Sequence, residues 1–117
     1  MFFFFFFMSF ESALQALNAG DAFEAEKQLR RLVNKPDSPD PGSAEFSLGL
    51  VLERQDRLDE AAEWLSRAVA LKTDVMQRAL TRKILASVLG RIPGREAEAR
   101  VLAEEVAQER LLLLGPN

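Results

Sequence analysis

Residues 44–68, AEFSLGLVLERQDRLDEAAEWLSRA, contain two apolar runs separated by a polar turn. The first run has Gly49 among large aliphatic residues. The second run places Ala61, Leu65 and Ala68 at the spacing of one helical face. Small side chains at positions 49 and 61 allow two antiparallel helices to approach closely, where larger side chains would push them apart. The stretch therefore predicts a helix, a tight turn and a second helix.

The same pattern occurs three times along the chain. In each copy a turn-forming residue is followed by three variable residues and then by Glu-Ala, which opens an amphipathic run. The copies are Gly20–Ala25, Asp56–Ala61 and Gly94–Ala99, and they begin 36 and 38 residues apart. Repetition at such periods is typical of helical repeat arrays. The run Leu48–Leu52 is matched in the same way by Leu85–Leu89, so each unit is expected to be a helical hairpin.

This pattern resembles the tetratricopeptide repeat, and the middle unit carries the resemblance best. The matching positions are Leu48, Gly49 and Leu52 in its first helix and Ala61, Leu65 and Ala68 in its second. The resemblance implies an all-α fold, a short right-handed solenoid of about six helices in antiparallel hairpins. We expect a single domain over residues 9–117, with units at roughly 9–34, 42–74 and 75–108.

Local signals support these boundaries. The segment Asn34–Gly42 contains three prolines and is expected to be a loop between the first two units. Asp21 with Glu24 has the spacing of a capping box. Asp56 is expected to add negative charge at the start of the second helix of the middle unit. Gly115 and the following proline are expected to stop the last helix.

Composition restricts the function. The 117-residue chain has no Cys, no His and a net charge of −3. These absences remove thiolate metal sites, cysteine nucleophiles and every Ser-His-Asp arrangement. The acidic pairs Asp59-Glu60 and Glu104-Glu105 come with no pocket signal. We therefore expect no enzyme activity, no cofactor and no metal. Without a basic stripe, we expect no nucleic-acid partner.

The resemblance also implies where a partner would bind. In the family, the concave surface lined by the first helix of each unit holds extended or helical segments of other proteins. The corresponding residues here are Phe10, Leu14, Phe46, Ser47, Leu50, Arg54, Lys83 and Ser87. Core packing is the alternative interpretation for the Phe and Leu residues of this set, and Leu48 and Leu52 are expected in the core. The predicted function is a non-enzymatic adaptor or scaffold that binds a peptide or an amphipathic helix.

The last helix carries a second candidate surface. Leu111–Leu114 are four consecutive leucines, which occupy all sides of a helix, so at least one is expected to face outward unless something covers it. The alternative function is therefore a structural protein that self-associates through the apolar ends of its array, giving a homo-oligomer.

The chain opens with Met1 and six consecutive phenylalanines. This run is too short to span a membrane and lacks the flanks of a signal peptide. We therefore expect no membrane association and a cytoplasmic location. Ser9 is a good N-cap. We expect residues 1–8 to be an extension outside the domain and the working protein to begin at Met8. The alternative is that part of the run extends the first helix.

Overall fold

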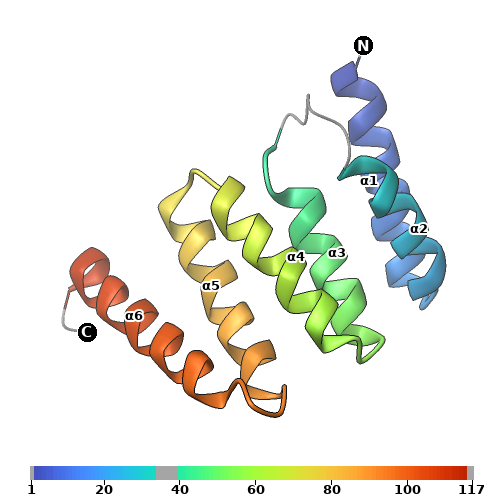
Figure 1. Cartoon of the computed structure of the whole chain (residues 1–117). Helices are drawn as coiled ribbons and strands as arrows, with labels where there is room; N and C mark the ends of the chain where they lie inside the picture. Colours follow the sequence, from blue (N-terminus) through green and yellow to red (C-terminus); the bar gives the residue numbers. More distant parts are fainter. Residues whose placement is uncertain (1, 34–39, 116–117) are drawn as a thin grey trace.

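The computed structural model describes residues 2–33 and 40–115 of the chain. In these residues the chain forms six helices and no strand, which confirms the all-α prediction (Figure 1). The helices are α1 (Phe2–Asn18), α2 (Ala22–Leu32), α3 (Ser43–Arg54), α4 (Leu58–Leu71), α5 (Val75–Gly90) and α6 (Glu96–Leu114). They pair as three hairpins, α1 with α2, α3 with α4, and α5 with α6.

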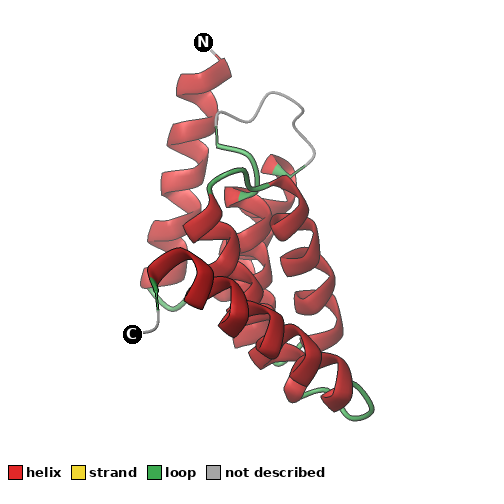
Figure 2. Cartoon of the chain, turned by 90° about the vertical axis from the view of Figure 1, so that its left-hand side faces the viewer, coloured by secondary structure: helices red, strands yellow, loops and turns green. Residues whose placement is uncertain are grey.

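The hairpins stack side by side into an elongated array of 43 × 30 × 23 Å. Helix α3 packs on α2 and helix α5 packs on α4, so each hairpin joins the next through a second helix and a first helix. Helices α1 and α6 lie towards opposite ends of the array (Figure 1), and the side view of Figure 2 shows the remaining helices lined up behind α6. Because α6 ends the array, no further hairpin of the described chain packs on it.

The two helices of the middle hairpin approach closely at Gly49. A Cβ built on Gly49 of α3 would lie 2.7 Å from Cγ of Leu65 and 3.4 Å from the carbonyl oxygen of Ala61, both on α4. The predicted close approach of two helices at Gly49 and Ala61 is therefore confirmed. Leu48 and Leu52 are fully buried, as expected.

The core runs through all three hairpins. Its fully buried large side chains come mostly from the middle one, because this hairpin is covered on both sides. They are Leu29, Leu48, Val51, Leu52, Leu65 and Thr81. Helix α6 by contrast buries only Ala99, since one of its faces has no neighbouring helix.

The turn of each hairpin contains one residue in the left-handed conformation. These are Gly20, Asp56 and Gly94, with φ of +85°, +60° and +92°, so the three predicted turn-formers occupy equivalent positions. In the first two turns the backbone closes with a Schellman motif. The N–H groups of Asp21 and Arg57 donate to the carbonyl oxygens five residues back, at 2.8 and 3.0 Å.

Two helices begin with a side-chain cap. The Asp21 carboxylate accepts a hydrogen bond from the Glu24 backbone N–H at 3.0 Å, which confirms the predicted role of Asp21. Asp74 caps α5 in the same way through Gln77, at 2.8 Å. At α4 the cap residue is Arg57, whose side chain makes no capping hydrogen bond.

Two predictions at the ends of the helices have different outcomes. The expected helix start at Ser9 is wrong, because the α1 backbone is already helical from Phe2 onwards. Phe has only a modest helix penalty, and no Gly or Pro separates the phenylalanine run from Ser9. The expected stop at Gly115 is confirmed, since α6 ends at Leu114 and the Gly115 N–H donates to Leu111. The proline-rich loop lies largely outside the described residues, as residues 34–39 are not among them.

Candidate functional site

The predicted groove residues on α1 are partly buried. Phe10 packs against the core, and Leu14, one helical turn further on, is also half-buried. Both side chains keep some accessible surface. Each side chain is therefore partly packed and partly accessible, so the groove and the core interpretations each describe part of its environment.

Helix α3 carries four of the predicted residues, in different environments. Phe46 packs against the core, and its ring lies 5.3 Å from the Lys72 ammonium. Leu50 is half-buried and Arg54 is exposed at the end of the helix. Ser47 is only 7% exposed, so this side chain offers almost no surface to a partner.

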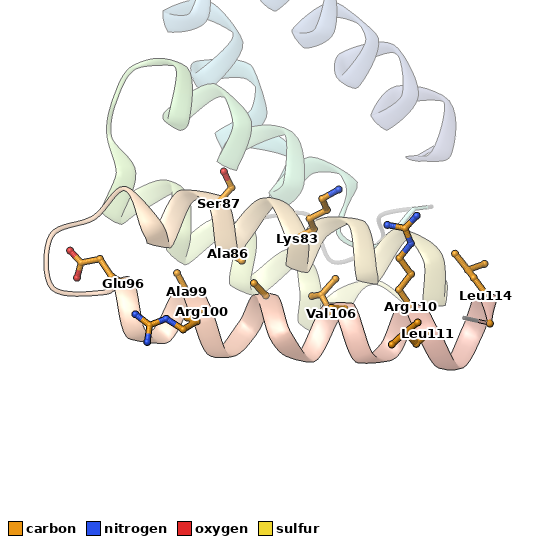
Figure 3. A pocket seen from close by; sticks show the side chains of 13 residues that line it. Lys83, Ala86, Ser87, Glu96, Ala99, Arg100, Val106, Arg110, Leu111 and Leu114 are labelled. Carbon is orange, nitrogen blue, oxygen red and sulfur yellow. The ribbon is translucent and has the colours of Figure 1, made fainter. Parts of the chain in front are cut away.

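The two predicted residues on α5, Lys83 and Ser87, are exposed and line a hollow between α5 and α6 (Figure 3). The hollow has a volume of about 1150 Å³. Its floor is apolar, and α6 provides most of it. The floor residues are Ala86, Ala99, Ala103, Val106, Ala107, Leu111 and Leu114. Sequence reasoning placed Lys83 and Ser87 on a binding surface, but it did not find the α6 wall.

Charged side chains surround this floor. Lys83 of α5 and Arg100 and Arg110 of α6 line the hollow, and none of the three has an ion pair or hydrogen bond within the described residues. The single carboxylate in the lining, Glu96, accepts the Gly94 backbone N–H at 3.0 Å. Backbone hydrogen bonds, its own and that of Gly94, hold the pKa of Glu96 below its ordinary value. The hollow therefore presents an excess of unpaired positive charge around an apolar floor.

A polar network joins the first two hairpins away from the hollow. Glu26 of α2 is largely buried and accepts hydrogen bonds from Arg30 at 2.9 Å, Arg57 at 2.7 Å and Gln55 at 3.0 Å. Glu60 accepts from the same two arginines. Burial alone would raise the pKa of Glu26, but hydrogen bonds from Gln55, Arg30 and Arg57 outweigh it and lower the pKa. The sequence signal for this network was weak, because its members come from separate units.

One member of each acidic pair considered for catalysis has a structural partner. Glu60 pairs with Arg57 at 2.9 Å, and this hydrogen bond lowers the pKa of Glu60. Arg82 of α5 pairs with Glu105 at 3.0 Å and also with Glu109. In the described part of the chain no group of three or more acidic residues is placed to hold a metal ion.

Further apolar side chains are exposed on the last helix. Leu111–Leu114 are between 46% and 88% exposed, so the prediction that at least one leucine faces outward is confirmed.

Among the described residues no helix is long and apolar enough to cross a membrane. Trp64 of α4 lies partly buried against the core, with the Arg67 guanidinium 4.6 Å from its ring centroid.

Stacked antiparallel hairpins, closed by small residues and turned at left-handed positions, define an α-helical repeat protein. A family model described as tetratricopeptide repeat matches residues 10–75, more than half of the chain. The chain therefore belongs to the tetratricopeptide repeat family. No curated protein and no solved structure matches it significantly. Repeats of this family generally mediate protein–protein interactions and are typically not enzymes.

Proposed function

We propose that the chain is a non-enzymatic adaptor that holds a peptide or amphipathic helix of another protein across the first helices of its hairpins. The observation that carries the proposal is a row of equivalent side chains on α1, α3 and α5. At one level the row is Phe10, Phe46 and Lys83, and at the next it is Leu14, Leu50 and Ser87. Every one of these side chains keeps accessible surface.

The chemistry of the row changes along the array. It is aromatic and aliphatic on α1 and α3, and polar on α5, with Arg54 at the end of α3 adding a positive charge. An amphipathic segment can bury apolar side chains against the first two hairpins and meet Lys83 on the third. Phe46 supports such a contact well, because the core already fixes its ring and little side-chain entropy remains to be lost.

A capture experiment with matched variants tests the proposal. Leu14→Glu with Leu50→Glu introduces charge into the row at two half-buried sites, while Phe23→Glu does the same on α2, where Phe23 is 75% exposed. We expect partners captured by the intact chain to be lost with the double variant and kept with Phe23→Glu. Helical content measured by circular dichroism identifies any variant that has unfolded. Equal capture by a folded double variant would rule out binding across the row.

The exposed leucines of α6 favour a second candidate, self-association of the chain. Leu112 is 88% exposed, and a leucine so exposed gains free energy when another surface covers it. Sedimentation over a concentration series measures this directly. A mass that rises with concentration for the intact chain, but not for Leu112→Lys, supports the candidate, and a constant monomer mass removes it.

The extension over residues 1–8 and the cytoplasmic location stay predictions. Mass spectrometry of the N-terminus of the natural protein would test the first of them.

A further inference from the structure

We propose that the hollow between α5 and α6 is a docking site for one amphipathic helix of a partner protein, whose apolar face is flanked by acidic residues. This inference rests on the proposed role in protein binding, but it places the contact at the end of the array rather than across the row on α1, α3 and α5. We call this hollow the end seat.

Equivalent residues of α4 and α6 differ in how far they are covered. Ala103 and Val106 of α6 are equivalent to Leu65 and Ala68 of α4, counting from the matching Ala99 and Ala61. Leu65 and Ala68 are 0% exposed, on the helix against which α5 packs. Ala103 is exposed and Val106 is half-buried. The end seat therefore repeats positions that are covered on α4, which has α3 and α5 as neighbours, whereas α6 has only α5 in the described chain.

The length of the end seat also fits a helix. Its apolar lining on α6 runs from Ala99 to Leu114, which corresponds to about 22 Å at a rise of about 1.5 Å per residue. Figure 3 shows Ala99, Val106 and Leu114 spread along α6, beside Ala86 of α5. An elongated apolar trough with this length matches four turns of helix better than a compact small molecule.

Charge decides the kind of helix. Where the middle hairpin has buried Ala62, the last hairpin has exposed Arg100, and where the middle hairpin has Phe46, the last has Lys83. Together with Arg110, these cations lack partners within the described residues. Because Lys83, Arg100 and Arg110 line the hollow, a helix held in it would lie beside these three cations. Acidic flanks would pair with them, and basic flanks would be repelled.

A second copy of the chain is a poorer occupant. Head-to-tail stacking would seat α1 of one copy on α6 of another. On α3, which packs on the preceding hairpin, Leu48 and Val51 are fully buried. On α1 the equivalent positions are Ser12 and Gln15, which are exposed and polar. Polar side chains would then cover the apolar floor of the end seat, at a desolvation cost.

Two synthetic peptides provide the test. Both form an amphipathic helix with the same Leu and Ala stripe, and they differ in carrying Glu or Lys on the two flanks. Fluorescence anisotropy of the labelled peptides measures binding to the intact chain. We expect the Glu peptide to bind at least about tenfold more tightly than the Lys peptide. We also expect its affinity to fall with added salt.

Variants then locate the site. Ala107→Glu and Arg100→Glu change exposed positions of the end seat, and each is expected to weaken the Glu peptide by about tenfold or more. Arg31→Glu, an equally exposed position on α2, is the matched control and is expected to leave binding unchanged. Phe23→Glu, at a 75% exposed position on α2, is a second control and is expected to leave binding unchanged as well.

Several results would overturn the inference. Binding of neither peptide, or equal binding of both, would exclude an acidic helix as the occupant. If Leu50→Glu abolished binding of the Glu peptide and Ala107→Glu did not, the end seat would be excluded as the docking site. The proposed adaptor function would remain intact. A dimer that Ala107→Glu converts to a monomer would identify a second copy as the occupant.

Discussion

The guanidinium of Arg57 lies 2.7 Å from the carboxylate of Glu26, so the residue that precedes α4 is tied to the second helix of the hairpin before it. Gln55, at the end of α3, donates to the same carboxylate. Glu26 is thereby satisfied by two groups from the turn of the next hairpin. This carboxylate connects two repeat units at a place where apolar packing between them gives way to solvent.

Replacing this carboxylate tests how much the connection stabilises the array. The Glu26 side chain is 11% exposed and that of Arg57 is 37% exposed. Because the arginine is partly solvated, we expect Glu26→Gln to lower the free energy of unfolding by only about 1–2 kcal/mol. Urea denaturation measures it. Glu63→Gln breaks the exposed pair with Arg67 and serves as control, with an expected loss below about 0.5 kcal/mol. Equal losses for the two variants would contradict a special role for Glu26.

The same carboxylate predicts a pH dependence. The pKa of folded Glu26 lies below its ordinary value of 4.5, so the folded chain binds fewer protons here than the unfolded chain. Its contribution is therefore fully present above the unfolded pKa and is lost as the pH falls through the folded pKa. The difference in unfolding free energy between the intact chain and Glu26→Gln should shrink from neutral pH to below the folded pKa. A difference that stays constant would show that the pKa of Glu26 is not lowered by folding.

Two helical glycines should respond in opposite ways to alanine. At Gly49 a new Cβ would lie 2.7 Å from Leu65, whereas at Gly90 it would find only the Cβ of Ala99 at 3.8 Å. We expect Gly49→Ala to destabilise the fold by about 1–3 kcal/mol through overpacking. Gly90→Ala should stabilise it by less than about 1 kcal/mol, because alanine at this last residue of α5 loses less backbone entropy on folding than glycine does. Thermal unfolding of the two variants compares them directly, and the same sign for both would refute the packing argument.

The turn of the middle hairpin uses a residue that is not glycine in a left-handed conformation. Asp56 has φ of +60°, which costs more for alanine than for aspartate and least for glycine. We expect stability in the order glycine, aspartate, alanine at this position, with a loss of about 1 kcal/mol for Asp56→Ala. Asp56 also lies 3.6 Å from Arg91, but both side chains are well exposed and the pair adds little. Chemical denaturation of the two variants establishes the order. An alanine variant as stable as the glycine variant would contradict it.

The sequence predicted the parts of the fold that repeat. Gly49 and Ala61 indicated a close pair of helices, and Gly20, Asp56 and Gly94 indicated the turns, because each of these requires a particular residue type at a particular place. The start of α1 was predicted wrongly. Ser9 has the chemistry of an N-cap, but a cap residue does not end a helix that is already continuous through it, and nothing before Ser9 breaks the helix.

The candidate site was predictable in part. Lys83 and Ser87, predicted as groove residues of their unit, line the hollow. The α6 wall was missed, because residues such as Ala103 and Val106 have the character of core positions in any single unit. Only the stacking order shows that no following helix of the described chain covers them. The Glu26 network was missed for a related reason, since its pairing depends on how two hairpins sit against each other.

The end of the array should also differ from its middle in local opening. Helix α6 spans 19 residues and buries only Ala99, while α3 and α4 are packed on both sides. Amide hydrogens near the end of α6 should therefore exchange with solvent much faster than those of α3, since little apolar contact opposes their local unfolding. Hydrogen exchange followed by mass spectrometry measures this gradient. A uniform rate along the chain would mean that the three hairpins open only together.

Because of this gradient, hydrogen exchange in the last hairpin would also show whether a helix is bound to it. A helix held against Ala103 and Val106 would give α6 the second neighbour that α4 already has, and exchange there would slow towards the rate of the middle hairpin. Part of the binding free energy would then be used to order α6. The less stable α6 is in the unbound chain, the weaker the binding at this end of the array would be.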